Sequence, residues 1–302
     1  MSKCIAETAK MKLAIIGVGL IGGSLGMSLK AALGDDIYIT GLCRTQDSMD
    51  LAMERGAVDF ASSDLETVVK DADIVFLSTP VLQMPPLVAR MLPFLKPGVI
   101  LTDAGSTKGY LYEKLREILP SDVYYIAGHP MTGKEKSGVA AADKDLFKNH
   151  AYIIVGDTGA PREAHEKLRA LLEHTEATFY ELGYEAHDRC ASIISHIPHI
   201  TAAALVTLLN RSGDDFESCL KLAAGGFKDT TRVASGDSDM WADICMTNPI
   251  AIRDHLVRMQ GILGEVIKYI DQGDRDGVYQ YFLAAKRSRD EIIWRTEKLF
   301  EL

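Results

Sequence analysis

The sequence lacks the features of several large protein classes. Its five cysteines are odd in number, scattered and never spaced as Cys-x-x-Cys, which argues against a disulfide framework and against a thiolate zinc site. No run of Lys and Arg is long enough to form a basic patch, and the formal net charge is −9. Because proteins that bind duplex nucleic acid usually carry such a patch, we expect no nucleic-acid partner.

Long apolar segments are also scarce. The first ten residues mix charged and small side chains and contain no apolar stretch of the kind found in signal peptides. No window of the sequence approaches the roughly 18 consecutive apolar residues of a membrane span. We therefore expect no membrane association. Unpaired cysteines fit a reducing compartment, so we expect a cytoplasmic protein.

What is present is a normal globular composition. The chain has 302 residues, of which 47% are hydrophobic and 25% charged, enough for one large domain or two of ordinary size. Short apolar runs alternate with helix-period segments, as in stacked βαβ units. Strands are predicted at 11–16, 37–42, 73–78, 99–102, 124–127, 151–155 and 177–181, and helices at 20–33 and 46–55.

Beyond about residue 182 the strand signals stop. Helical patterns then cover 191–209, 215–224, 249–272 and 276–300. This change predicts an α/β architecture in which a Rossmann domain at 1–182 precedes an all-α domain at 183–302. Pro198 falls inside the first helical pattern and should kink that helix or mark its first turn.

A glycine-rich loop follows the first predicted strand. Gly17, Gly19 and Gly22 form Gly-x-Gly-x-x-Gly and open the predicted helix 20–33, the context that a dinucleotide-binding loop requires. The first glycine permits a tight turn, the second lets the backbone approach a pyrophosphate, and the third lets helix and strand pack closely. The alternative is a glycine-rich turn that binds nothing. We assign five cofactor-binding residues here, namely Gly17, Gly19, Leu20, Ile21 and Gly22.

The choice of cofactor depends on the end of the second predicted strand. An acidic residue that binds the ribose is expected there, but the position holds Cys43, followed by Arg44 and Thr45. A guanidinium and a hydroxyl suit a 2′-phosphate, which favours NADP. NAD stays open, because surface arginines on loops are common. Three further cofactor-binding residues are assigned where the strand 73–78 stops, namely Ser78, Thr79 and Pro80.

Three other segments carry polar residues where chemistry could take place. Asp-Ala-Gly-Ser-Thr-Lys at 103–108 and Gly-His-Pro-Met-Thr-Gly-Lys at 128–134 each follow a predicted strand, and ligands of open α/β sheets lie at the carboxyl ends of strands. The third, Ser-His-Ile-Pro-His at 195–199, opens the helical half. Further on, Phe-Lys-Asp-Thr-Thr-Arg at 227–232 ends in Arg232.

In this order and spacing, these segments resemble those of the prephenate/arogenate dehydrogenase family of tyrosine biosynthesis. The likeness runs from the glycine loop to the region around Trp241. It implies an oxidoreductase that oxidises a cyclohexadienyl 4-hydroxyl with hydride transfer to NAD(P)+ and loses the ring carboxylate as carbon dioxide. The implied substrate is prephenate, or arogenate in an arogenate-specific enzyme. The implied assembly is a homodimer formed through the C-terminal helices.

The resemblance also implies roles for individual residues. His129 would accept the proton of the 4-hydroxyl, for which an imidazole has a suitable pKa. Ser106 would hold His129 or bond the same hydroxyl. His199 would line the substrate pocket, and Arg232 would pair with a substrate carboxylate through its planar fork. Three further residues would be gating or substrate-side groups, namely Lys134, Glu135 and Asp229.

Other interpretations remain. His196 and His199 share a helix face, but no third ligand is evident, so we expect no metal and interpret His196 as structural. A β-hydroxy-acid dehydrogenase of related build would use a lysine in the helical half, such as Lys221 or Lys228. A non-catalytic dinucleotide sensor is a different class, and it would leave the polar segments without a role.

Overall fold

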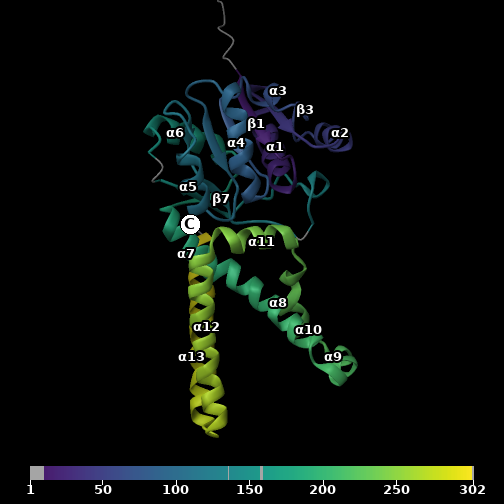
Figure 1. The fold of residues 1–302 in the computed structure, drawn as a ribbon, viewed down its shortest axis with the longest axis vertical. Helices are drawn as coiled ribbons and strands as arrows, with labels where there is room; N and C mark the ends of the chain where they lie inside the picture. The colour runs from purple at the N-terminus through teal and green to yellow at the C-terminus, as the bar shows by residue number, and fades with distance from the viewer. Residues whose placement is uncertain (1–9, 135, 157–158, 301–302) are drawn as a thin grey trace, which may run out of the picture. The chain divides into compact units, whose positions relative to one another are not determined.

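A computed structural model describes residues 10–134, 136–156 and 159–300 and divides the chain into two compact units, Met1–Asn248 and Pro249–Leu302. The first unit contains a parallel sheet of order β3-β2-β1-β4-β5-β6 (Figure 1). The order reverses between β1 and β4, which is where dinucleotides bind in such sheets. The strands are β1 (Met11–Ile16), β2 (Ile37–Leu42), β3 (Phe60–Ser62), β4 (Ile74–Leu77), β5 (Ile100–Asp103) and β6 (Tyr124–Tyr125).

Helices cover both faces of this sheet. Side chains alternate between the two faces of a strand, so Leu13 and Ile15 of β1 enter one apolar core, whereas Ala14 and Ile16 enter the other. All four are fully buried, as expected of a parallel sheet covered on both sides. The helices are α1 (Leu20–Leu33), α2 (Gln46–Glu54), α3 (Leu65–Val69), α4 (Met84–Met91) and α5 (Gly109–Arg116).

A second sheet of three strands continues the α/β part. It consists of β7 (Gly128–Pro130), β8 (Ala151–Val155) and β9 (Thr178–Leu182), with α6 (Arg162–Glu173) between the last two. β7 runs antiparallel to β8 and pairs His129 with Ile153, whereas β8 and β9 are parallel. β7 and β3 were not predicted, because each has only three residues.

The helical part of the first unit starts at Tyr184. The predicted helix 191–209 is in fact interrupted: α7 (Tyr184–Ala191) leads through a π-helical turn at Ser192–His196 into α8 (Ile197–Asn210). Pro198 lies in the first turn of α8, as one of the two expected outcomes. Shorter helices follow, namely α9 (Phe216–Leu222), α10 (Gly225–Thr231) and α11 (Ser238–Thr247).

The second unit consists of two long helices, α12 (Pro249–Asp271) and α13 (Arg275–Phe300). They lie side by side (Figure 1) and are joined by a turn in which Gly273 has a φ of +62°, a conformation that glycine adopts at no steric cost. The fold is thus a Rossmann-like α/β domain followed by a helical domain. The predicted boundary between residues 182 and 183 stays a prediction.

One helical stretch differs from the expectation that no segment is apolar enough to span a membrane. Among the described residues, the helical stretch Tyr184–Asn210 is long and apolar enough to cross a membrane by length and composition. Its most apolar 18-residue segment has a mean hydropathy of 1.6, and 22% of that segment is buried. No Asp, Glu, Lys or Arg occurs from Cys190 to Asn210, but serines and histidines interrupt the apolar run. Core helices of soluble proteins pass the same test.

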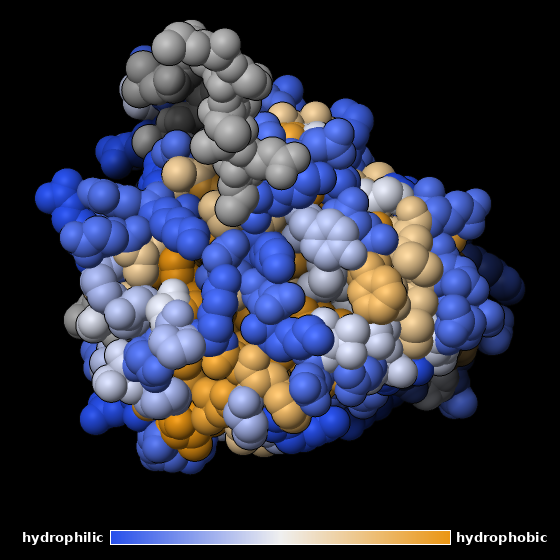
Figure 2. All heavy atoms as spheres, turned by 90° about the horizontal axis from the view of Figure 1, so that it is seen from above, coloured by the Kyte–Doolittle hydropathy of each residue, from blue (hydrophilic) through white to orange (hydrophobic). Residues whose placement is uncertain are grey.

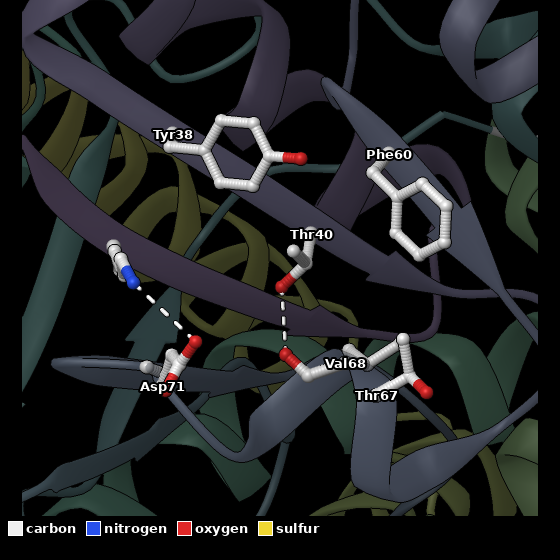
Figure 3. Close-up of a pocket in the computed structure, with 8 residues that line it drawn as sticks. Tyr38, Thr40, Phe60, Thr67, Val68 and Asp71 are labelled. Atoms are coloured by element: carbon white, nitrogen blue, oxygen red, sulfur yellow. Dashed lines mark hydrogen bonds and ion pairs between the residues drawn. The ribbon is translucent and has the colours of Figure 1, made fainter.

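A hollow of about 260 Å³ lies over β2 and β3 (Figure 3). In it the Thr40 hydroxyl donates to the Val68 carbonyl at 2.8 Å, and Lys12 pairs with Asp71 at 3.4 Å. Because Lys12 lies near the amino end of β1, whereas the glycine loop leaves its carboxyl end, the hollow is not the dinucleotide site. The face of the molecule in Figure 2 is mainly hydrophilic, with apolar side chains exposed toward its lower edge and on its right side.

Candidate functional site

The glycine loop has the geometry of a dinucleotide loop. Gly17 has a φ of +97°, which favours glycine. A Cβ on Gly22 would lie 2.5 Å from the Gly17 carbonyl oxygen, so this residue must be small for α1 to pack on the loop. A Cβ on Gly19 would meet nothing within 4 Å. The space that this Cβ would occupy is therefore open to a pyrophosphate.

The first turn of α1 is open to an anion as well. Its N-cap is Gly19, no side chain caps it, and it contains no acidic residue. Leu20 and Ile21 form this turn, so free N–H groups and the positive end of the helix dipole are available for phosphate. The residues present therefore fit a dinucleotide.

The segment after β4 supports the glycine loop. Ser78 donates from its backbone to the Ile16 carbonyl at 2.9 Å and from its hydroxyl to the Gly17 carbonyl at 2.7 Å. Next to it, the Thr79 hydroxyl is buried and has no partner among the described residues. Pro80 follows and is exposed. Ser78 therefore holds the loop, and the buried hydroxyl of Thr79 lies beside it.

The end of β2 carries the residues assigned to cofactor choice. Cys43 is buried, and burial raises the pKa of its thiol, opposed by a hydrogen bond with the Val18 backbone. Thr45 is the N-cap of α2 and accepts from the Ser48 backbone N–H at 3.3 Å, so its hydroxyl has a structural use. Arg44 is exposed and makes no ion pair with the residues that the structure describes. Arg44 is therefore the side chain at this end of β2 that is available for a phosphate.

A buried ion pair fixes the loop after β5. Asp103 and Lys108 are both fully buried and pair with each other. Asp103 also accepts from the Tyr125 hydroxyl at 2.8 Å, and Lys108 donates to the Gly128 carbonyl at 2.6 Å. Burial lowers the pKa of Lys108, opposed by the charge of Asp103. The pair thus ties the 103–108 loop to the residue that precedes His129.

His129 is the first member of a chain of hydrogen bonds. Its Nδ1 lies 2.8 Å from Nε2 of His187, and Nδ1 of His187 lies 2.9 Å from Oδ1 of Asp188. The Asp188 carboxylate also accepts from the backbone N–H groups of Lys108 at 2.7 Å and Gly109 at 2.9 Å. α7 therefore supplies the groups that hold the imidazole of His129, and the start of α5 holds those groups in turn.

Burial keeps both imidazoles neutral. It lowers the pKa of His129 well below the usual histidine value, and the neighbouring His187 and Lys108 lower it further. Burial also lowers the pKa of His187, against the hydrogen bond to Asp188. Nε2 of His129 makes no hydrogen bond with the described residues. It is accessible to a ligand, whereas Nε2 of His196 is fully buried. This nitrogen can therefore accept a proton from a ligand.

His187 and Asp188 were missed by sequence reasoning. The one available signal is a histidine next to an aspartate at the start of the helical half, which is weak by itself. Ser106 was expected to hold His129 or bond the same substrate hydroxyl. Its half-buried side chain makes no hydrogen bond with any residue in the described ranges, His129 included.

The third predicted segment joins the same cluster. His199 stacks on Trp241, with ring centroids 3.5 Å apart and planes 18° apart, and a Cβ on Gly236 would lie 2.9 Å from His199 Cε1. His196 lies edge-on to Trp241. The Asn248 amide donates to the Asp188 carbonyl at 2.8 Å and lies 3.4 Å from Nδ1 of His196. α7, α8 and α11 thus meet at one end of the sheet (Figure 1).

His196 predicts a pH dependence of stability. Burial lowers its pKa from 6.5 to about 4, so the folded chain binds fewer protons than the unfolded chain between these values. Stability therefore falls as pH falls from 6.5 to 4, by up to about 3 kcal/mol at 1.36 kcal/mol per pKa unit. In His196→Gln, urea unfolding at pH 7 and pH 4.5 should differ less than in the wild type. The exposed His150→Gln serves as control, and an unchanged pH difference in His196→Gln would contradict the assignment.

The other predicted site residues that the structure describes lie elsewhere in the first unit. Lys134 pairs with Asp143 at 2.8 Å on the surface, and Glu135 lies outside the described residues. Asp229 is exposed on α10. Arg232 is exposed and opens a 3₁₀ turn at Arg232–Ser235 that packs against α8, the helix of His199. Within the described ranges, no group of three His, Cys, Asp or Glu side chains is placed to hold a metal.

Comparisons with known proteins agree with this architecture. Residues 25–181 match the family model of the prephenate dehydrogenase nucleotide-binding domain, and residues 184–284 match that of the prephenate dehydrogenase dimerization domain. The chain is 35% identical to prephenate dehydrogenase of Bacillus subtilis, over 93% of this chain and 76% of the relative.

Solved structures give the same result. The prephenate dehydrogenase of Aquifex aeolicus in complex with hydroxyphenyl propionate and NAD+ has a TM-score of 0.87 at 28% identity, over 95% of this chain and 99% of that one. The arogenate dehydrogenase of Synechocystis has a TM-score of 0.80 at 29% identity, over 93% of this chain and 100% of that one. With a matching family model over both domains and a curated relative at 35% identity, the chain belongs to the prephenate dehydrogenase family.

Proposed function

We propose that this protein is a prephenate dehydrogenase, which converts prephenate to 4-hydroxyphenylpyruvate and carbon dioxide. The observation that carries the proposal is His129, a buried imidazole that is neutral, held at Nδ1 and free at Nε2. A base for a substrate hydroxyl needs these properties. The glycine loop supplies a fitting site for the hydride acceptor in the same unit.

The residues of the site divide the reaction among them. A bound nicotinamide supplies the acceptor for the hydride that leaves C4 of the substrate. Nε2 of His129 takes the proton of the 4-hydroxyl as this hydride leaves. The bond to the ring carboxylate then breaks, its electrons make the ring aromatic, and His129 returns the proton to the phenolic oxygen. Because burial lowers the pKa of His129, the imidazolium gives up this proton readily. Ser106 is suited to orient the same hydroxyl.

Arg232→Ala should mainly raise KM for the substrate. We propose that Arg232 pairs with a substrate carboxylate, and a hydrogen bond to a charged group contributes about 1.5–3 kcal/mol, or on the order of 10–100-fold. Steady-state kinetics measure the effect, with Lys228→Ala, an exposed cation on α10, as control. An unchanged KM together with a collapse of cofactor affinity would remove Arg232 from the substrate side.

For the cofactor, we propose a preference for NADP. This rests on Cys43 in place of an acid and on Arg44, whose guanidinium makes no ion pair with the described residues. The test is a four-way assay of prephenate and arogenate, each with NAD+ and NADP+. A strong preference for NAD+ would contradict the role of Arg44. Turnover of arogenate but not prephenate would replace the proposed substrate by the alternative one.

The β-hydroxy-acid alternative has less support. Its candidate lysines, Lys221 on α9 and Lys228 on α10, are both exposed, whereas the pairing of His129, His187 and Asp188 would have no role. Turnover of β-hydroxy acids without turnover of prephenate would nevertheless favour it. Cofactor binding without turnover of any of these substrates would favour a dinucleotide sensor.

We also propose a homodimer in the cytoplasm. Residues 184–284 match a dimerization domain, and large apolar side chains are exposed on α12 and α13, among them Ile262, Ile267 and Phe282 at 47%, 59% and 61%. Covering such surfaces stabilises an oligomer. Light scattering coupled to gel filtration tests the proposal, and a mass of one chain at micromolar concentration would contradict it.

A further inference from the structure

We propose that His187 and Asp188 are positioning residues that hold His129 in the one tautomer whose Nε2 accepts the substrate proton, and that they share the positive charge which this proton brings. The inference rests on the proposed function, because it explains how the proposed base is prepared. It is carried by the contacts of Asp188, His187 and His129.

The order of donors and acceptors starts at Asp188. Both of its carboxylate oxygens accept backbone N–H groups from the start of α5, Oδ1 from Lys108 and Oδ2 from Gly109. The carboxylate is therefore an acceptor toward His187 as well, and Nδ1 of His187 must carry a hydrogen to make the 2.9 Å contact.

This hydrogen determines the state of both rings. A neutral imidazole protonated on Nδ1 has a lone pair on Nε2, so His187 accepts at Nε2. The 2.8 Å contact then requires a hydrogen on Nδ1 of His129. His129, neutral because it is buried, therefore has its lone pair on Nε2, the nitrogen that no described residue occupies. The other tautomer would place two lone pairs against each other and a hydrogen toward the substrate hydroxyl.

The same chain can carry charge away from the reacting oxygen. When Nε2 of His129 accepts the substrate proton, the Nδ1–H bond of His129 can break as an Nε2–H bond forms on His187. His129 is then neutral and protonated on Nε2, and His187 is a cation against the Asp188 carboxylate. The reverse transfer restores the starting state, so no proton is gained or lost.

The other charged groups around His129 and His187 do not stabilise a positive charge on these two imidazoles. Lys108 and His196 disfavour a charge on His129, and the Asp103 carboxylate is already paired with Lys108. Asp188 is the carboxylate that directly accepts a hydrogen from His187. The positive charge of an additional proton on the two imidazoles is therefore stabilised by Asp188. Asp188 contacts the pair through His187.

Two variants of His187 separate these effects. His187→Phe keeps a ring of similar size but removes both nitrogens, so His129 loses its tautomer control and its link to Asp188. We expect kcat to fall on the order of 10–100-fold, with KM and cofactor affinity within about twofold. The acid limb of the kcat/KM profile should move to lower pH, because losing the link to the Asp188 carboxylate lowers the pKa of His129 by more than removing His187, which itself lowers that pKa, raises it. His187→Gln can keep an acceptor for Nδ1–H of His129 and should lose less activity.

The decisive measurement does not depend on turnover. Nitrogen-15 NMR of the imidazoles in the wild-type protein should show His129 protonated on Nδ1 and not on Nε2, and His187→Phe should show a mixture of tautomers. Wild-type protein with His129 protonated on Nε2 would overturn the inference, as would a His187→Phe enzyme with wild-type kcat and acid limb. The exposed His150→Gln is the control for unspecific effects. If the tautomers are as expected but prephenate is not turned over, the proposed function fails and the tautomer assignment stands.

Discussion

Replacing His129 with alanine should lower kcat on the order of 10²–10⁴-fold, the usual contribution of a positioned acid–base group. The backbone of His129 pairs with Ile153, and alanine keeps that pairing, so β7 should persist. The glycine loop is built by other residues, so dinucleotide affinity should stay within a factor of about two. The loss should therefore appear in kcat rather than in cofactor binding.

The measurement is steady-state kinetics with prephenate, combined with a dinucleotide titration of the same variant. His150→Ala, which removes an exposed imidazole, is the matched control and should keep wild-type kcat. If added imidazole restores part of the lost rate in His129→Ala, the missing group acts through a proton. A kcat within a factor of a few of the wild type would show that another group is the base.

The glycine loop and the strands beside it could be predicted because their causes are local. β1, β2 and β8 begin and end at the predicted residues, since each is an apolar run bounded by turn residues. The three glycines each have the predicted reason to be glycine: a positive φ, an open space and a close contact. Features of this kind are determined by neighbouring residues in the sequence, so they do not depend on how distant elements pack.

The hydrogen-bonded partners of His129 could not be predicted, because their causes are not local. His129 and His187 are 58 residues apart in sequence, and they meet because Asp188 on α7 binds the start of α5. β7 has three residues and contains a proline, so it shows no periodicity. The π-helical turn at Ser192–His196 likewise reads as continuous helix in the sequence. Packing between elements decides each of these features.

Gly19→Val should abolish most of the dinucleotide affinity while the fold persists. The backbone at Gly19 has a φ of −99° and a ψ of −148°, which do not require glycine, and a Cβ there meets no atom within 4 Å. The cost to the fold is the loss of a favourable N-cap residue, about 1 kcal/mol. The valine would instead fill the space through which a pyrophosphate reaches the first turn of α1, and losing those hydrogen bonds costs about 3 kcal/mol, or on the order of 100-fold.

Gly22→Ala is the matched comparison, because its Cβ would lie 2.5 Å from the Gly17 carbonyl oxygen and 2.7 Å from Ile15 Cγ2. Overpacking of this kind lowers the free energy of unfolding by about 1–3 kcal/mol. Fluorescence titration with NADH and NADPH should therefore show a loss of affinity in Gly19→Val. Urea unfolding should show a loss of stability in Gly22→Ala. Unchanged affinity in a folded Gly19→Val protein would mean that the dinucleotide does not approach this loop, because a Cβ at this position meets no described atom within 4 Å and points into the space assigned to the pyrophosphate.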